Sequence, residues 1–185
     1  MFYFISDTHF HHNRSFIYQP RGFNSIEEMN NTIINNWNST VTDEDDIYVL
    51  GDFFLGTDLE FVKNTLDILN GRIHLIIGNH DTPTKIEIYK NHPNIIDIQY
   101  AYQIKYNKRM FYMSHYPTLT ASLEQDCHRA LFNLFGHTHS KDKFYNDMPF
   151  MYNVACDAHN STPVSIEEIC KDIDNEIDKC ISYLV

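Results

Sequence analysis

The stretch Leu75-Ile76-Ile77-Gly78-Asn79-His80-Asp81 joins a predicted buried strand to three side chains that could form part of a functional site. Residues 75–77 are a short apolar run, typical of a buried strand, and Gly78 allows the backbone to turn sharply where that strand ends. An amide, an imidazole and a carboxylate follow side by side. In open α/β sheets, ligands bind beyond the carboxyl ends of the strands, so we expect these side chains at a binding edge. Standing alone, the stretch is explained equally well by a polar surface turn.

The same pattern recurs four more times along the chain. Apolar runs that we expect to be strands each end in side chains able to bind a metal, at Asp7-x-His9, Gly51-Asp52, Gly78-Asn79-His80-Asp81, Ser114-His115 and Gly136-His137-x-His139. Five such clusters at one topological position are hard to explain as unrelated turns. Mixed oxygen and imidazole ligands suit Mn²⁺, Fe, Co²⁺, Ni²⁺ or Zn²⁺ better than Ca²⁺.

The spacing within the clusters has a physical meaning. In Asp7-x-His9 and His137-x-His139, alternate residues of an extended segment point the same way, so each pair can face one cavity. A lone carboxylate between two such groups can bridge two metals that lie roughly 3.5–4 Å apart. Asp52 is the best candidate for that bridge.

The segments between the clusters predict a mixed α/β architecture. Helices are expected at residues 25–38, 57–69 and from Ser165 onward, beginning at the capping boxes Ser25/Glu28, Thr57/Glu60 and Ser165/Glu168. The first five elements alternate strand and helix, which predicts parallel pairing with right-handed crossovers.

The second half of the chain has a different character. Residues 96–105 and 109–113 are expected to form a hairpin through Asn107-Lys108. We expect a long loop at residues 10–24, a C-terminal cap at Gly71 and a short helix within residues 118–129.

Composition narrows the class of protein. The 185 residues are 43% hydrophobic and 14% aromatic, which predicts one folded domain spanning residues 1–185. The net charge of −11 repels phosphate backbones, so binding of long nucleic acid is not expected. No apolar run approaches the roughly 20 residues that span a bilayer, so we expect no membrane association. The four cysteines form no C-x-x-C pair, and we interpret them as reduced thiols of a cytoplasmic protein.

The five clusters, in this order, resemble those of the calcineurin-like metallophosphoesterases. The match extends from Asp7 to His139, and the size resembles the small bacterial, archaeal and phage members that lack a cap domain. The resemblance implies an α/β fold, a four-layer α/β/β/α sandwich of two mixed sheets flanked by helices.

The resemblance also implies a role for each matching position. The first metal would be held by Asp7, His9 and His139, the second by Asn79, His115 and His137, and Asp52 would bridge them. His80 matches the family's catalytic histidine, and Asp81 would support its turn. Two divalent ions are implied, with Mn²⁺ favoured and Fe, Co²⁺, Ni²⁺ or Zn²⁺ as alternatives. A hydroxide bridging the metals would attack phosphorus in line, and His80 would stabilise or protonate the leaving oxygen.

The expected activity is hydrolysis of a small phosphate ester, with nucleotides among the candidates and diesters favoured over monoesters. One alternative is a nuclease acting on nucleic-acid ends, which the acidic charge disfavours. Another is a non-catalytic scaffold with this fold, which the complete ligand set disfavours. Because Phe53 and Phe54 follow Asp52 where protein Ser/Thr phosphatases carry aspartate and arginine, that activity is not expected. The oligomeric state is left open.

Three residues of the 10–24 loop are candidates for substrate binding. Arg14 and Arg21 carry the guanidinium group that binds phosphate well, and His12 lies between the first ligand pair and Arg14. The alternative is a solvated polar loop. Asn153 and Asp157, after the last ligand pair, either support the metal ligands or shape a turn.

Overall fold

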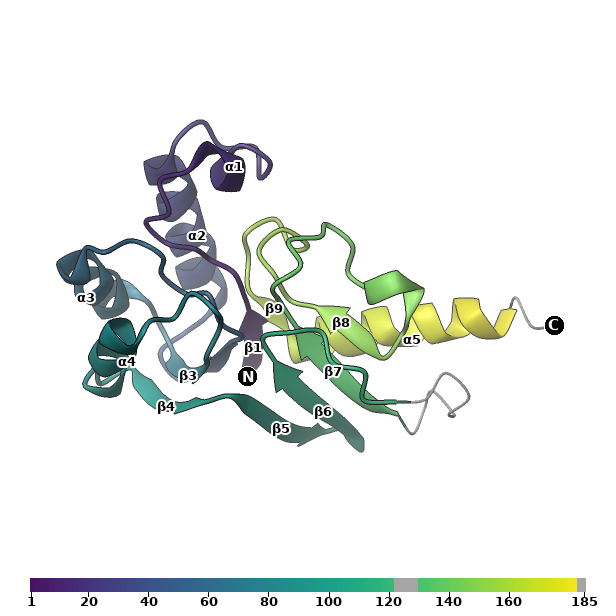
Figure 1. Ribbon diagram of the computed structural model, residues 1–185. Helices are drawn as coiled ribbons and strands as arrows, with labels where there is room; N and C mark the ends of the chain where they lie inside the picture. The colour runs from purple at the N-terminus through teal and green to yellow at the C-terminus, as the bar shows by residue number, and fades with distance from the viewer. Residues whose placement is uncertain (122–129, 183–185) are drawn as a thin grey trace.

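Two sheets form the framework of the computed structural model, which describes residues 1–121 and 130–182, with side chains to residue 179 (Figure 1). The first sheet has the order β4-β3-β2-β1-β9 and the second the order β5-β6-β7-β8. The strands of the first sheet are β1 (Phe2–Ile5), β2 (Asp46–Val49), β3 (Arg72–Ile76), β4 (Ile95–Gln99) and β9 (Val164–Ser165). Those of the second are β5 (Ala101–Tyr106), β6 (Arg109–Ser114), β7 (Leu131–Phe135) and β8 (Met151–Asn153).

Both sheets are mixed, as the sequence predicts. Strands β1 to β4 pair in parallel, and only the short β9 runs antiparallel to β1. In the second sheet, β5 and β6 form the expected antiparallel hairpin, whereas β6, β7 and β8 are parallel. The helices are α1 (Ser15–Tyr18), α2 (Ile26–Thr40), α3 (Leu59–Ile68), α4 (Pro83–Lys90), the 3₁₀ helix η2 (Tyr145–Asp147) and α5 (Ile166–Ser182).

The central strands β1 and β2 of the first sheet are largely buried because each of their faces packs against a different apolar layer. In β1, Phe4 packs into a cluster shared with the second sheet, while Ile5 packs against α2, α3 and α4. Ile47 and Tyr48 of β2 divide in the same way. This alternation explains why the strands read as continuous apolar runs. Four isoleucines of α5 pack into the cluster that the two sheets share, namely Ile166, Ile169, Ile173 and Ile177.

The helix starts show where local sequence decided the structure. Ser25 accepts a hydrogen bond from the Glu28 amide and Ser165 from the Glu168 amide, so two of the three expected caps are confirmed. The third is wrong: α3 begins after Asp58, whose carboxylate accepts from two amides of the first turn. Leu59, the first residue of the helix, is 37% exposed.

Other differences arise where short elements depend on tertiary packing. Gly71 does not cap α3, which ends at Ile68; it has φ +95° and turns the chain into β3. The 10–24 loop contains α1, and α4 and β9 were not predicted. The expected strand at 96–105 is two strands in different sheets, broken at Tyr100. The helix expected at 118–129 falls mostly on residues outside the described ranges.

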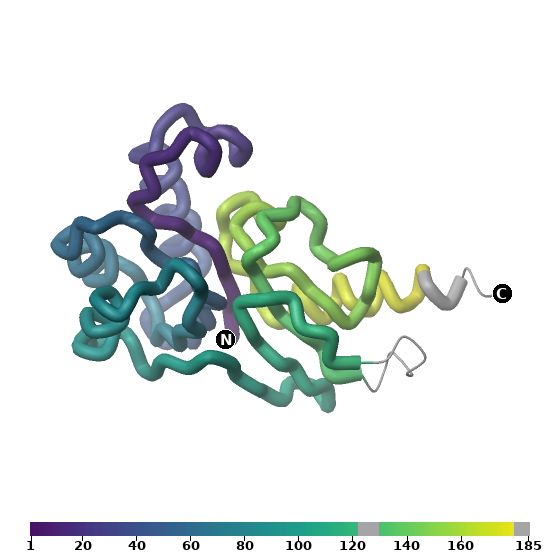
Figure 2. Tube along the Cα trace, in the orientation of Figure 1, coloured from purple at the N-terminus to yellow at the C-terminus, as the bar shows by residue number. Residues whose placement is uncertain are grey.

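The two sheets meet at the carboxyl ends of their strands. Beyond β1, Ser6 forms a parallel bridge with Ala155, which follows β8 in the second sheet. The Ser6 amide donates to Val154 O at 3.1 Å, and the Cys156 amide donates to Ser6 O at 3.0 Å. In Figure 2, the segment after β1 and the segment after β8 run next to each other. One binding edge is therefore made from both sheets.

No helix in the described part of the chain is long and apolar enough to cross a membrane. Cys156 is a buried free thiol and Cys170 a half-buried one, consistent with the expected reduced cysteines.

The turn between β5 and β6 provides a test of backbone strain. Asn107 and Lys108 form a two-residue loop with φ of 45° and 67°, the geometry of a type I′ turn. Glycine occupies the second position of such turns without steric cost, whereas lysine does not. We expect Lys108→Gly to raise the free energy of unfolding by about 0.5–1 kcal/mol, measured by urea denaturation. Lys105→Gly, inside β5, is the matched control and should lower it by about as much; equal effects of the two changes would contradict this account.

Candidate metal centre

Three side chains converge beyond the ends of β1 and β7 to form the first cluster, Asp7, His9 and His139. The Nε2 atoms of His9 and His139 are 3.2 Å apart, and each lies 3.8 Å from Asp7 Oδ1. These three atoms lie on a circle with a radius of about 2.1 Å, which equals a usual metal–nitrogen bond length. The cluster therefore has the dimensions of a site for one divalent cation.

The second cluster, Asp52, His115 and His137, lies beyond the ends of β2, β6 and β7. His115 Nε2 is 3.5 Å from Asp52 Oδ2 and 2.9 Å from Asn79 Oδ1, so the amide oxygen of Asn79 joins this group. The structure thus brings together all seven residues that the resemblance implies as metal ligands.

Asp52 connects the two clusters. Its Oδ2 atom is 3.7 Å from His9 Nε2 in the first cluster and 3.5 Å from His115 Nε2 in the second. The other oxygen, Oδ1, accepts the His80 amide at 2.8 Å. One carboxylate oxygen is therefore anchored to the backbone, and the other faces both groups of candidate ligands.

Hydrogen bonds from Nδ1 fix the ring orientation of two candidate ligands, His115 and His139. His115 Nδ1 donates to Leu50 O at 2.8 Å, and His139 Nδ1 donates to Asp157 Oδ2 at 3.0 Å. Each bond places the ring proton on Nδ1 and leaves the Nε2 lone pair directed at its cluster, as is usual for metal-binding histidines. Asp157 therefore supports a candidate metal ligand rather than only shaping a turn. Asn153 does not contact a candidate ligand in this way; its side-chain amide donates to the backbone carbonyl oxygens of Ser140 and Asp142.

The Asp7 carboxylate shows how well the donor set fits a cation. Its Oδ2 atom accepts from Ser6 Oγ at 2.7 Å and from the His137 amide at 2.8 Å. Its Oδ1 atom is buried and has no hydrogen-bond partner among residues 1–121 and 130–182. Burial raises the pKa of this carboxyl, against the nearby imidazoles of His115 and His139. An unpaired buried oxygen is costly, and a bound cation removes that cost.

Burial also prepares His9 for a cation. It lowers the pKa of His9 to about 2, and the neighbouring His139 and Arg21 act in the same direction. The imidazole is therefore neutral at pH 7, which is the form that binds metal ions.

The backbone at the clusters is strained. Positive φ angles, rare outside glycine, occur at five of the seven candidate ligands, namely Asp7 (54°), His9 (47°), Asp52 (53°), His137 (68°) and His139 (51°). Each such residue costs about 1–3 kcal/mol, and such residues gather at functional sites. The fold sustains this strain where it gathers the donor atoms.

Two glycines permit the close approach of the segments. A Cβ atom at Gly136 would overlap Ser6 Oγ and Asp7 Oδ2, and one at Gly78 would overlap Asp52 Oδ1. The φ angle of Gly78 is not in the left-handed region. Gly78 is therefore required by the space beside Asp52 rather than by the sharp turn expected from the sequence.

His80 and Asp81 have different surroundings. His80 is exposed, and its ring centroid lies 5.6 Å from that of His9. Asp81 is buried and accepts hydrogen bonds from the amides of Gly78, Asp52 and Phe53. Burial raises the pKa of Asp81 to about 6, although these amides oppose the rise. We infer that Asp81 positions the segments after β2 and β3.

The three candidate substrate contacts also differ. Arg21 binds Asp157 through two hydrogen bonds of 3.0 and 2.7 Å and donates to Asp7 O at 2.7 Å; its side chain is 2% exposed. These contacts favour a positioning role for Arg21. Arg14 is exposed at the start of α1, and His12 lies with its ring 5.5 Å from that of His9.

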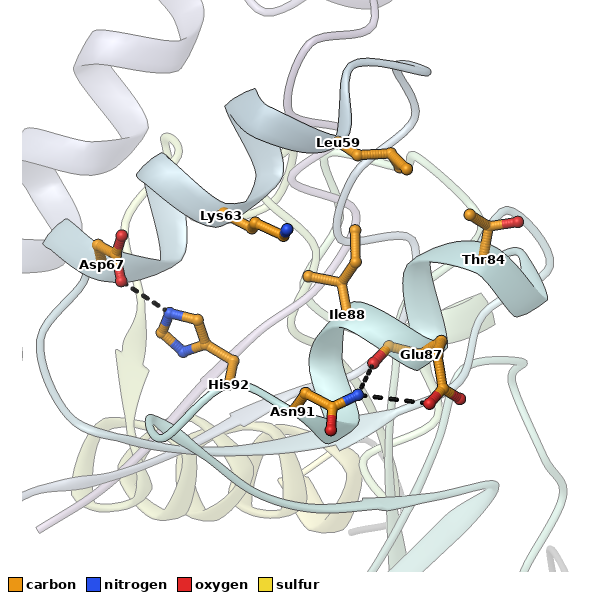
Figure 3. Close-up of a pocket in the computed structure, with 8 residues that line it drawn as sticks. All are labelled: Leu59, Lys63, Asp67, Thr84, Glu87, Ile88, Asn91 and His92. Atoms are coloured by element: carbon orange, nitrogen blue, oxygen red, sulfur yellow. Dashed lines mark hydrogen bonds and ion pairs between the residues drawn. The ribbon is translucent and has the colours of Figure 1, made fainter.

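A hollow of about 650 Å³ opens beside the clusters. It is lined by His9, His12, Phe16, Ile17, Pro20, Leu55, His80, His139 and Asp157. A second hollow, of about 710 Å³, lies between α3 and α4 (Figure 3). Four of its polar residues pair with one another, Asp67 with His92 and Glu87 with Asn91. Only the first hollow adjoins candidate metal ligands among the residues described.

Several residues of the site were not found from the sequence. Lys85, buried on α4, donates from Nζ to the carbonyl oxygens of Phe54 and His80 and so fixes the two turns around the site. Tyr116 packs edge-on against the rings of His115 and His137, at 5.0 and 4.7 Å. The only signal for Tyr116 was its place next to His115. Lys85 gave none, because a lysine in a helix is ordinarily exposed.

The fold and the site together define a class of protein: two mixed sheets with flanking helices whose joined edge carries two His/Asp clusters suited to a dinuclear metal site. The chain belongs to the calcineurin-like phosphoesterase superfamily, whose domain model matches residues 1–160. It is 34% identical over 175 residues to the uncharacterized protein MJ1445 of Methanocaldococcus jannaschii, covering 91% of this chain and 89% of that protein.

A solved structure shows the same architecture. The crystal structure of AQ665, a protein of unknown function from Aquifex aeolicus, matches with a TM-score of 0.70 and 27% identity, covering 92% of this chain and 98% of that one. A structure described as a novel archaeal phosphodiesterase matches with a TM-score of 0.49 and 20% identity, covering 82% and 81% of the two chains.

The bond between Asp157 and His139 gives a test of how the first cluster is supported. We expect Asp157→Ala to weaken Mn²⁺ binding at one of two sites by about 10–100-fold, because His139 loses the group that orients it. Titration calorimetry on metal-stripped protein measures this effect. Asp172→Ala on α5 removes a carboxylate that bonds Tyr152 and Lys143 instead, and is the matched control. Equal Mn²⁺ affinity in wild type and Asp157→Ala would contradict a supporting role.

Proposed function

We propose that this protein is a metal-dependent hydrolase of phosphate esters, that diesters are preferred to monoesters, and that Mn²⁺ is the favoured metal. The observation that carries the proposal is the position of Asp52 Oδ2, 3.7 Å from one cluster and 3.5 Å from the other. A carboxylate so placed can hold two cations at the separation that phosphoesterases use. Membership of the phosphoesterase superfamily supports the same reaction class.

The residues that would hold the ions are the two clusters with Asn79. Bound divalent ions lower the pKa of a coordinated water and neutralise charge on the phosphate oxygens. The proposed donor set contains only two carboxylates, Asp7 and Asp52, against a charge of about +4. Asn79 contributes a neutral oxygen where an aspartate would cancel part of that charge. The loaded site is therefore locally positive in a chain whose net charge is −11.

His80 is the proposed catalytic acid. Its amide is fixed to Asp52 Oδ1 at 2.8 Å, and Lys85 Nζ holds its carbonyl oxygen at 3.1 Å. The backbone of His80 is thus fixed while its exposed imidazole lines the hollow beside the clusters. From there the ring can donate a proton to the oxygen that leaves phosphorus.

The charges around the hollow support the preference for diesters. Its described lining residues include no lysine or arginine, and the nearby Arg21 is engaged with Asp157. A monoester brings two negative charges, whereas a diester brings one. A hollow that offers no further cation suits the singly charged ester better.

Asp52→Asn tests the proposed bridge. Metal-stripped protein supplied with Mn²⁺ should hydrolyse bis(p-nitrophenyl) phosphate faster than p-nitrophenyl phosphate. Asp52→Asn should lower kcat/KM by roughly 10²–10³-fold, because one preorganised charge is lost. Asp67→Asn removes a carboxylate of α3 that pairs with His92 and should leave the rate unchanged. Wild-type protein that binds no Mn²⁺ and has no turnover would instead favour a non-catalytic scaffold.

His80→Ala separates acid catalysis from metal binding. We expect unchanged Mn²⁺ stoichiometry by equilibrium dialysis and a fall in kcat of about 10²–10⁴-fold. The fall should be larger for a diester with an alkyl leaving group than for one with p-nitrophenolate, because a poor leaving group depends more on protonation. Loss of metal together with activity would show instead that His80 is a ligand or a structural residue.

A further inference from the structure

We propose that the hollow beside the clusters selects phosphate esters whose organic group carries an aromatic ring, and that Phe16 and Leu55 contact that ring. The proposal rests on the proposed function in one respect: the clusters would hold the phosphate. It adds the chemical class of the group attached to phosphorus.

The hollow is lined by two kinds of side chain. His9, His80 and His139 belong to the candidate catalytic site. Phe16, Ile17 and Pro20, from the segment around α1, together with Leu55 form its apolar lining, which we call the apolar wall. A phosphate held at the clusters therefore has apolar side chains within the same hollow. The volume of about 650 Å³ lies within the roughly 300–1,000 Å³ typical of small-molecule sites.

Phe16 is the most informative residue of this apolar wall. Its side chain is 67% exposed, although a large aromatic residue is normally buried. Its ring meets that of His12 edge-on, with centroids 5.6 Å apart and planes at 89°. The next two residues, Ile17 and Tyr18, pack against the core, so α1 is anchored by them while Phe16 remains uncovered. An anchored, uncovered ring beside candidate catalytic residues is suited to stacking on a substrate.

The absence of free charge on the wall restricts the substrate further. Asp157, the one acidic residue among the described lining residues, bonds to Arg21 and His139. The described lining includes no lysine or arginine that would bind a second phosphate. The wall is thus suited to a neutral ring rather than to a polyphosphate or a sugar acid.

The hollow between α3 and α4 does not offer this combination. Lys63 extends from α3 into the space between the two helices, so a charged side chain lies in this hollow with the apolar Leu59 and Ile88 (Figure 3). No candidate metal cluster of the described residues includes a residue that lines it. Its size alone therefore does not make it the substrate site.

Binding of unreactive phosphonates to the Mn²⁺-loaded protein tests the proposal without turnover. Titration calorimetry should give a Kd for phenylphosphonate at least about fivefold lower than that for methylphosphonate, since stacking of one ring is worth that much or more. Phe16→Ala and Leu55→Ala should each remove most of this ratio and leave the Kd for methylphosphonate unchanged. Ile68→Ala, which removes an exposed apolar side chain of α3, should preserve the ratio.

A second pair of ligands distinguishes an aryl ester from a nucleoside ester. Adenosine 5′-monophosphate and ribose 5-phosphate differ by the base alone. Tighter binding of the nucleotide, lost in Phe16→Ala, assigns the wall to a nucleobase; equal binding of this pair with a retained phenyl preference assigns it to a simple aryl group.

The result separates this proposal from the proposed function. Equal affinity for the two phosphonates, or no binding of either, overturns the aromatic preference even if the protein hydrolyses diesters. A phenyl preference that survives Phe16→Ala and Leu55→Ala overturns the assignment of these residues. A preference that depends on both residues in a protein without hydrolytic activity would uphold the binding proposal and refute the hydrolase.

Discussion

The hydrogen bond between the His137 amide and Asp7 Oδ2, 2.8 Å long, joins the end of β7 in one sheet to the end of β1 in the other. It leaves Asp7 Oδ1 unpaired and facing His9 and His139. The rest of the site depends on this division of one carboxylate into an anchored and an available oxygen. Asp52 repeats it, with Oδ1 on the His80 amide and Oδ2 between the clusters. Gly136 and Gly78 are fixed by the same arrangement, because a side chain at either position would fill the space that these oxygens occupy.

Most of the candidate metal ligands could be predicted from the sequence because each of them follows directly after an apolar run that forms a strand. The apolar runs before Asp7, Asp52, Asn79, His115 and His137 define the strands, and parallel pairing places their ends together. The supporting residues could not be predicted in the same way. Arg21 is bound to Asp157 across 136 residues of chain, and Lys85 reaches two carbonyl oxygens from a helix that lacked a clear pattern. Such contacts depend on how loops pack, which local sequence does not encode.

The incorrect predictions have two causes, a competing local cap in one case and tertiary contacts in the others. Asp58 displaced Thr57 as the cap of α3 because its carboxylate reaches two amides, and the start of the helix moved by one residue as a result. The strands β4 and β5 appeared as one because both are β-rich, whereas a change of sheet at Tyr100 is a tertiary event. The two-residue β9 is too short to carry any periodicity. Elements that owe their existence to a neighbour rather than to their own residues were the ones missed.

The position of β1 in its sheet has a consequence for how the chain is assembled on the ribosome. This strand is synthesised before the other strands of the sheet, and it lies between β2 and β9, which includes residues 164–165. One side of β1 therefore has no backbone partner until residues 164–165 have emerged. The extension at Ser6 likewise waits for Ala155. A nascent chain that stalls before this point presents an open apolar strand, which makes it a substrate for chaperones and proteases.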